Sequence, residues 1–399
     1  MPAGPDPIPR RAHRRAAAAA WAGGAVLALL AAFCGAQPPP TSGPDAPPPG
    51  LVAPGARPEG GDAPAPETSP AEPAPAAGKP AGPPIALVLP LASPDYARAA
   101  EAVRDGFLAA ADAAGARDRV RVYSHANDDV LAAIDAAREA GARVIVGPLV
   151  RDDLKALVAS GRDLPVTIAL NQLDDATPLP PRVYTFALAI ESDARTIARR
   201  LRDDGAASVA VIGGDSPLMR RFANAFAAEW ILAGGNVPLR FPFVATPDGL
   251  RVLRSDLAKV PLDAIVIAVD GPDAALVKTY APRVATWASG QVNQRRDPAT
   301  MRDLEDVRFV DVSWIVSPDA PAFAKLPRPD YASAALDRLY ALGLDAFRVA
   351  EVFVVAPPDR LSFDGATGRV ELSDARQIAR EGSLATFRAG AIVPLDAPR

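Results

Sequence analysis

Residues 85–91 read IALVLPL, an uncharged run, and apolar residues at helical spacing follow it over 95–115. A continuous apolar run is typical of a strand that is covered on both faces, as in a parallel sheet. The same alternation continues downstream, with expected strands at 120–123, 143–146, 165–170 and 183–186 and expected helices at 128–140 and 151–160. Strands and helices in serial order predict a parallel sheet with helices on both of its faces.

A second series of the same kind begins at Glu191. Its expected helices are 192–204, 217–233, 248–258 and 272–280, and its expected strands are 208–212, 239–244 and 264–268. Residues 289–304 are polar and without a period, which indicates a loop, and a long helix at 331–355 and a hairpin at 361–372 follow. The predicted fold class is therefore α/β, with two doubly wound parallel-sheet lobes that face each other.

The N-terminus has the order of an export signal. The only cysteine, Cys34, follows an arginine cluster at 10–15 and an apolar run at 16–33. Residues 1–34 are therefore predicted to be a signal peptide whose lipidation site is Cys34, so that a lipid anchor holds the mature chain in a membrane. Phe33 departs from the small residue that usually precedes a lipidated cysteine. Two alternatives stay open, which are cleavage after Ala36 and retention of the apolar run as an anchor.

Residues 35–84 are rich in proline and alanine and contain no aromatic residue. Such a composition cannot bury enough apolar surface to offset the chain entropy lost on folding. Its prolines favour extended polyproline II, which predicts a disordered tether between membrane and domain. The alternative is a leader whose length has no importance.

The bulk composition narrows the function. About 315 residues follow the tail, enough for one large two-lobed domain or two small ones. The net charge of −4 and the scattered arginines predict no nucleic-acid partner. A single cysteine allows no internal disulfide, and no later apolar run is long enough for a second membrane span.

The side-chain inventory predicts no enzyme, no cofactor and no metal site. Only two histidines are present, and His13 lies in the signal, so any hydrolytic triad or zinc site would have to use His125. The turn 213–216 (GGDS) lacks the spacing of a phosphate-binding loop and is better explained as a tight turn with a helix cap. The acidic pairs at 128–129 and 174–175 are better explained as caps and solvated loops than as a calcium site.

Candidate ligand contacts are the polar residues just past the carboxyl ends of strands, where open α/β sheets form their ligand crevice. These residues are Ser93, Tyr96, Gly147, Asn171, Gln172, Gly214, Ser216, Asp270 and Ser289. Asp270 would supply the acid for a ligand's ammonium group. Each residue has an ordinary alternative as a turn former or strand end, and no arginine stands out as a carboxylate clamp.

Several stretches resemble the type I periplasmic binding-protein fold and, more closely, the LppC-type lipoproteins, a family of penicillin-binding-protein activators. The matching stretches are IALVLPL (85–91), AEAVRDGFLAA (100–110), GARVIVGPLVRDDLKAL (141–157), LPVTIALN (164–171), YTFALAIESDA (184–194), RRFANAFAAEW (220–230), RLYALGLDAF (338–347) and FDGATGRVEL (363–372). The resemblance implies lobe 1 at 85–187 plus 313–352 and lobe 2 at 188–312 plus 353–399. The hinge would lie at 187–192, 310–314 and 350–357.

The resemblance also implies a function. It implies a lipoprotein on the periplasmic side of the outer membrane that regulates peptidoglycan synthesis as a non-catalytic activator of a class A penicillin-binding protein. The long activators carry an N-terminal helical-repeat domain, whereas this chain has a proline-rich tail. The alternative is a solute-binding lipoprotein that captures a small-molecule ligand, such as an amino acid, for a transporter.

Overall fold

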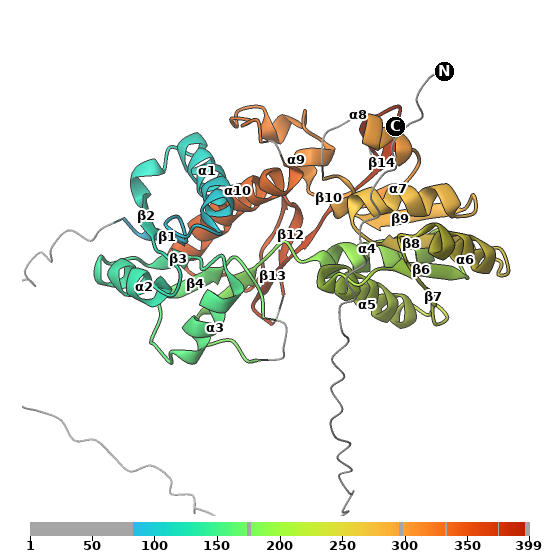
Figure 1. The fold of residues 1–399 in the computed structure, drawn as a ribbon. Helices are drawn as coiled ribbons and strands as arrows, with labels where there is room; N and C mark the ends of the chain where they lie inside the picture. Colours follow the sequence, from blue (N-terminus) through green and yellow to red (C-terminus); the bar gives the residue numbers. More distant parts are fainter. Residues whose placement is uncertain (1–82, 174–176, 295–297, 332, 374, 396–399) are drawn as a thin grey trace, which may run out of the picture. The chain divides into compact units, whose positions relative to one another are not determined.

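The computed structural model describes residues 83–173, 177–294, 298–331, 333–373 and 375–395 (Figure 1). The predicted signal peptide, Cys34 and almost all of the predicted tether lie outside these residues, as do Asp174 and Asp175. Across the described residues, no helix has the length and apolar character that a membrane span requires.

The first sheet has the strand order β11-β12-β13-β5-β4-β3-β1-β2. Its strands are β1 (Ile85–Leu89), β2 (Val120–Ser124), β3 (Val144–Val146), β4 (Val166–Ala169), β5 (Val183–Phe186), β11 (Ser362–Gly365), β12 (Gly368–Leu372) and β13 (Gln377–Glu381). Strand β1 lies between β2 and β3, and its Ile85 is opposite Val120 on one side and Val144 on the other, both in parallel pairs. The predicted doubly wound parallel sheet is confirmed here.

The apolar run of β1 is explained by helices on both faces of this sheet. Ile85, Leu87 and Leu89 pack in a core with α1 (Ala97–Ala113) and α10 (Ala334–Val355). The alternate residues Ala86 and Val88 pack with α2 (Val130–Glu139) and α3 (Arg151–Ala159). Successive strand side chains point to opposite faces, so a strand buried on both faces must be apolar throughout.

The second sheet has the order β15-β14-β10-β9-β8-β6-β7. Its strands are β6 (Val209–Gly213), β7 (Leu239–Pro242), β8 (Ala264–Ala268), β9 (Ala285–Ser289), β10 (Arg308–Asp311), β14 (Ser383–Arg388) and β15 (Ala391–Pro394). One face packs on α4 (Ile190–Asp203) and α5 (Pro217–Leu232). The other face packs on α6 (Pro247–Leu257), α7 (Gly271–Tyr280) and α8 (Pro298–Asp303).

Two sequence predictions need correction in this region. The expected loop at 289–304 contains a 3-10 turn, Gly290–Val292, and the short helix α8. The pattern also missed β9, which reads ATWAS, and β10, which reads RFVD, because polar residues interrupt both strands and neither forms a continuous apolar run.

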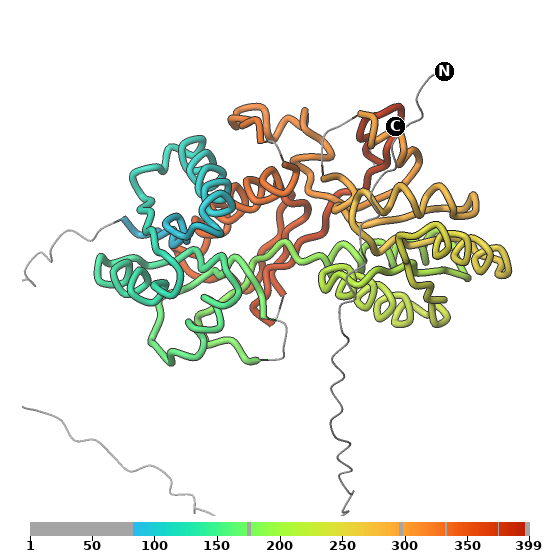
Figure 2. Tube along the Cα trace, viewed as in Figure 1, coloured from blue at the N-terminus to red at the C-terminus, as the bar shows by residue number. Residues whose placement is uncertain are grey.

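The chain passes between the sheets three times (Figure 2). It leaves the first sheet after β5, returns after β10 through α9 (Ser313–Val316), and leaves again at Gly382 between β13 and β14. The prediction that all residues from 353 onward lie in lobe 2 is wrong for β11, β12 and β13, which belong to the first sheet. The physical reason is that β13 pairs in parallel with the edge strand β5, with Ile378 opposite Phe186 in the same core.

Buried ion pairs join the segments at these passages. Arg338 of α10 donates to both carboxylate oxygens of Asp311, at 2.7 and 2.8 Å, and to the carbonyl oxygen of Gly290 at 2.6 Å. Arg380, at the end of β13, donates to Asp193 of α4 at 2.9 Å. All four charged side chains are less than one-tenth exposed. Two buried ion pairs therefore connect the segments at these passages, in addition to the chain itself.

Candidate functional site

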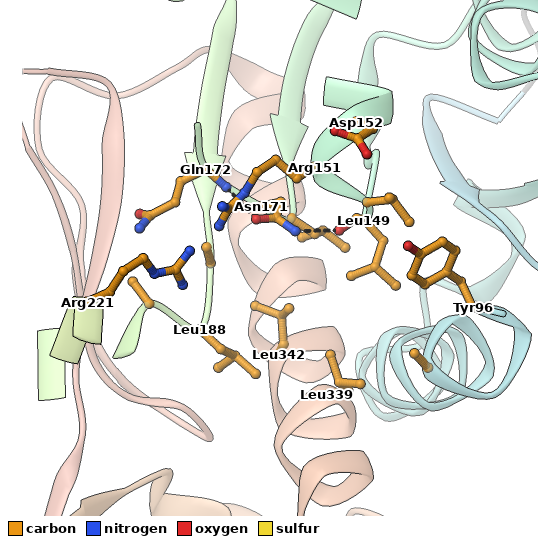
Figure 3. A pocket seen from close by; sticks show the side chains of 15 residues that line it. Tyr96, Leu149, Arg151, Asp152, Asn171, Gln172, Leu188, Arg221, Leu339 and Leu342 are labelled. Carbon is orange, nitrogen blue, oxygen red and sulfur yellow. Dashed lines mark hydrogen bonds between the residues drawn. The ribbon is translucent and has the colours of Figure 1, made fainter. Parts of the chain in front are cut away.

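A pocket of about 480 Å³ lies beside the passage from β5 to α4 (Figure 3). Residues from both lobes line it: Tyr96, Ala99, Leu149, Val150, Arg151, Asp152, Leu170, Asn171, Gln172, Ala187, Leu188, Ala189, Arg221, Leu339 and Leu342. Only Arg221 comes from a helix that packs on the second sheet. We call this the cleft pocket.

The carboxyl end of β4 forms one wall of the cleft pocket, as expected for a parallel sheet. The amide nitrogen of Asn171 donates to the carbonyl oxygen of Leu149 at 2.9 Å, and its amide oxygen accepts from the backbone of Gln172, also at 2.9 Å. Asn171 thereby joins the turn after β3 to the turn after β4. The side-chain oxygen of Gln172 accepts from Gln377 at 3.2 Å.

The cleft pocket also has leucine walls. Leu339 and Leu342 come from α10 and Leu188 from the passage between the lobes. Leu149 and Leu170 are less than one-tenth exposed and complete this surface. It suits the aliphatic part of a ligand or of a partner's side chain.

Two arginines bring positive charge to the same space. Figure 3 shows the guanidinium groups of Arg151 and Arg221 directed toward the region beside Asn171 and Gln172. Arg151 is the first residue of α3, and the Nε of Arg221 lies 3.0 Å from a carboxylate oxygen of Glu191. A planar guanidinium pair of this kind matches the geometry of a carboxylate.

The acids near the cleft pocket already have partners. Asp152 accepts from Lys155 at 2.9 Å, and this hydrogen bond lowers the pKa of the Asp152 carboxyl. Asp153 lies 4.0 Å from the Nε2 of the buried ring of His125. Burial raises the pKa of Asp153, although the charge of His125 opposes the shift. The Nδ1 of His125 lies 2.8 Å from the carbonyl oxygen of Ala126, which can only accept, so Nδ1 carries a proton.

Three of the nine predicted contacts, Tyr96, Asn171 and Gln172, line the cleft pocket together. The two other predicted contacts from lobe 1, Ser93 and Gly147, support the local fold instead of lining the pocket. Ser93 is buried, and its hydroxyl accepts from the backbone of Tyr96 at 3.3 Å. Gly147 has a φ of 117°, and a Cβ there would overlap the carbonyl oxygen of Val88.

The four predicted contacts from lobe 2 lie elsewhere in the structure. Gly214 lines a separate pocket between β6 and α5, and Ser216 and Asp270 are the residues that precede α5 and α7. Ser289 is buried, and its hydroxyl accepts from the backbone of Gln291 at 3.3 Å. The structure therefore does not bring these four residues to the cleft pocket.

Sequence reasoning missed the two arginines and the leucines of α10. Arg151 could have been found, because it directly follows the strand-and-turn stretch VIVGPLV and opens a helix. Arg221 and Leu342 carry no such signal, since they reach the pocket only through the packing of distant elements. The prediction that no arginine stands out is corrected by this geometry.

The cleft pocket supplies guanidinium, amide and apolar groups that can bind a ligand. Within the described residues, no group of three or more His, Cys, Asp or Glu side chains could hold a metal ion. Among the same residues, no hydroxyl hydrogen-bonds to the ring of His125. Guanidinium, amide and apolar side chains can recognise a carboxylate that carries an aliphatic group.

Two doubly wound lobes joined by three passages, with a pocket beside one of them, define a domain of the type I periplasmic binding-protein fold. The family model described as "LppC putative lipoprotein" matches residues 81–250 and 249–390. The chain belongs to the LppC family.

Similar proteins of known name fall into two groups. The penicillin-binding protein activator LpoA of Edwardsiella piscicida is 26% identical over 323 residues, which are 69% of this chain and 46% of that protein. The C-domain of LpoA from Haemophilus influenzae, a regulator of PBP1A, is 23% identical with a TM-score of 0.66, over 78% of this chain and 99% of that one. A Chromobacterium violaceum structure described as "a putative branched-chain amino acid ABC transporter" is 30% identical with a TM-score of 0.67, over 76% of this chain and 99% of that one. The chain spans about half the length of the curated relatives it matches.

Proposed function

We propose that this chain is an envelope lipoprotein that binds a class A penicillin-binding protein and regulates peptidoglycan synthesis without catalysing a reaction itself. The observation that carries the proposal is the match of the LppC family model to both lobes. The relatives named as activators of penicillin-binding proteins match the same region. Because this chain spans about half of their length, the proposed role belongs to the two-lobed domain and to its tether.

The structure of the domain supports a binding role. The buried pairs Arg338–Asp311 and Arg380–Asp193 join the two lobes at their passages. A domain held in this way presents a fixed surface, and fixed surfaces lower the ordering cost of binding a protein partner.

The membrane attachment belongs to the same proposal. Residues 1–33 would be removed, Cys34 would carry the lipid at the new N-terminus, and residues 35–84 would span the distance to the domain. The outer membrane is the proposed location, because an activator tethered there can extend toward the wall. Mass spectrometry of the mature N-terminus tests it: a diacylglyceryl-modified Cys34 is expected, and a chain that begins at Gln37 would contradict lipidation.

The regulatory role is tested with a purified class A penicillin-binding protein from the same organism. The mature chain is expected to co-purify with the synthase and to raise its rate of glycan polymerisation or of peptide cross-linking. A solute-binding protein of the same fold serves as the matched control. Binding without any change in either rate would contradict activation, and absence of binding would contradict the whole proposal.

A second candidate is capture of a small solute, and one observation favours it. The cleft pocket places two guanidinium groups beside leucine walls, an arrangement that fits an aliphatic amino acid. In this function Tyr96, Asn171 and Gln172 would contact the ligand. Calorimetry with a panel of amino acids tests it, with Asn171→Ala as the variant expected to weaken binding. No heat of binding for any member of the panel would exclude this function for that class of ligand.

A further inference from the structure

A second pocket, of about 650 Å³, lies in the other lobe at the end of the sheet away from the passages. It is formed where β9 and β10 begin and β14 ends, next to the carboxyl end of α7. Its charged residues are Lys278, Arg283, Arg308, Arg388, Glu305 and Asp306. We call it the basic pocket.

The cations of the basic pocket are weakly neutralised by the protein. Within the described residues, Lys278 and Arg283 form neither an ion pair nor a side-chain hydrogen bond. Among the residues that the structure describes, the carboxylate closest to Arg388 is that of Asp306, 3.9 Å from its Nε. Arg308 lies 3.8 Å from a carboxylate oxygen of Asp204. Both distances exceed that of a hydrogen bond, so these cations remain available to a ligand.

The two acids of the basic pocket do not cancel this charge. Both carboxylate oxygens of Glu305 accept from the backbone nitrogen of Ala389, at 3.1 and 2.9 Å. This contact uses the carboxylate to hold the loop after β14. Four cations thus line the pocket with two carboxylates, and Asp204 beside Arg308 is a third, whereas the whole chain has a net charge of −4. The local excess of positive charge runs against the charge of the protein.

The walls of the basic pocket add apolar surface to this charge. Pro282, Val284 and Leu395 line it beside the cations. Arg308 lies over the ring of Trp287, 5.6 Å from the ring centroid, which holds its side chain along the wall. A ligand that fills the pocket would therefore need both anionic and aliphatic groups.

We propose that the basic pocket is a docking site for an acidic segment of a protein partner, one that carries aliphatic side chains between its carboxylates. Charge complementarity provides the attraction, and the segment's aliphatic groups cover Pro282, Val284 and Leu395. A polyphosphate or a nucleic-acid backbone would satisfy the cations alone and leave this apolar wall exposed. The site is separate from the cleft pocket and does not require the proposed synthase to be the partner.

The test uses the mature chain and a fluorescein-labelled peptide of glutamate and leucine residues, titrated by fluorescence anisotropy. The peptide is expected to bind, and its affinity is expected to fall about tenfold or more between about 50 and about 300 mM salt. The double variant Lys278→Glu/Arg283→Glu is expected to weaken binding by about tenfold or more at low salt. The milder double variant Lys278→Gln/Arg283→Gln is expected to weaken it by a smaller factor.

The matched control changes the net charge equally at another place in the same lobe. Arg251, in α6, and Lys259, just beyond its end, are exposed, and within the described part of the chain they pair with Asp248 and Asp256 and with no other acid. The double variant Arg251→Glu/Lys259→Glu is expected to bind the peptide within about twofold of the parent chain. Thermal unfolding of each variant verifies that the lobe is folded.

Three results would overturn the proposal. One is the absence of peptide binding to the parent chain at low salt. Another is equal weakening by the control and test variants, which would indicate only an effect of net charge. The last is tighter binding of an inorganic polyphosphate of the same charge, which would assign the pocket to a phosphate ligand instead.

Discussion

The guanidinium group of Arg338 donates to both carboxylate oxygens of Asp311, at 2.7 and 2.8 Å, in the buried region where α10 meets the end of β10. The two residues belong to different lobes, so their bond is also a bond between the lobes. Burial opposes the charge of Arg338, but Asp311, together with Asp193 and Asp337, outweighs this effect and raises the pKa of the guanidinium. The guanidinium of Arg338 therefore keeps its charge in this buried position.

Removing one partner of this pair should cost more than removing both. Arg338→Ala leaves the Asp311 charge buried without its partner, and we expect a loss of about 3–5 kcal/mol in the free energy of unfolding. The double variant Arg338→Met/Asp311→Leu should lose less, because it leaves no buried charge. Urea denaturation measures both. If Arg338→Ala loses no more free energy of unfolding than the double variant does, the ion pair does not stabilise the contact between the lobes.

The ion pair at the other passage should make stability depend on pH. Burial raises the pKa of Asp193 to about 6, although the charge of Arg380 opposes the shift. The native carboxyl holds its proton more tightly than the unfolded chain does, so the native state binds more protons between about pH 4 and pH 6. The free energy of unfolding should fall as pH rises through this window, by at most about 1.4 kcal/mol per pH unit from this group.

The measurement compares the parent chain with Asp193→Asn by urea denaturation at several values within that window. Asp311 and Arg338 also influence Asp193, so only the difference between the two proteins isolates its titration. The advantage of the parent chain over the variant should shrink as pH rises from about 4 to about 6. A constant difference across the window would contradict a raised pKa at Asp193.

Two sequence stretches that mark the LppC family meet in the structure. Asp345, from RLYALGLDAF, accepts from the backbone of Ala366 at 2.9 Å and from the backbone and hydroxyl of Thr367 at 2.7 Å each. Burial raises the pKa of Asp345, while these hydrogen bonds oppose the shift. Gly365 leaves the room that the carboxylate needs, because a Cβ there would overlap it. The polar residues of these stretches thus hold the β11–β12 hairpin against α10.

Asp345→Asn should destabilise the domain, because an amide nitrogen, which is a donor, replaces one of the two carboxylate oxygens that accept from the hairpin. We expect a loss of about 2–4 kcal/mol, measured by urea denaturation. Thr367→Val removes only the hydroxyl and keeps both backbone donors, so a smaller loss of about 1 kcal/mol is expected. If the two variants lose the same free energy of unfolding, the hydrogen bonds from the backbone of Ala366 and Thr367 to Asp345 do not contribute to stability.

The sequence predicted the elements whose signal is local and missed those that depend on distant partners. The apolar run of β1 requires cover on both faces, so it predicted a parallel sheet without further information. By contrast, β13 reads QIARE, with only two buried side chains, and nothing in it indicates that it pairs with β5 rather than with the second sheet. The third passage was placed about 25 residues too early for this reason.

The residues of the cleft pocket likewise fall into those with a local sequence signal and those without one. Asn171 and Gln172 follow a strand whose end was predictable, and they lie in the cleft pocket. Arg221 reaches the pocket only because α5 of one lobe lies beside the end of β4 of the other, which no local pattern encodes. The four predicted contacts of lobe 2 do lie at or near the carboxyl ends of their strands, where open α/β sheets form their ligand crevice. They are absent from the cleft pocket because of the position of one lobe against the other.

The contact between α1 and α10 provides a prediction in which two effects have opposite signs (Figure 1). By helix propensity alone, Gly343→Ala should stabilise α10 by about 1 kcal/mol. In the structure, however, a Cβ at Gly343 would overlap the carbonyl oxygen of Val103, so the two helices would have to separate. Backbone atoms on both sides cannot move aside as a flexible side chain can, and we expect the free energy of unfolding to fall by about 1–3 kcal/mol.

Gly213→Ala is the control, since no atom lies within 4 Å of its added Cβ. Thermal and urea unfolding should show a loss for Gly343→Ala that the control does not share. A gain in stability for Gly343→Ala would mean that propensity outweighs packing and that α1 and α10 can move apart at little cost.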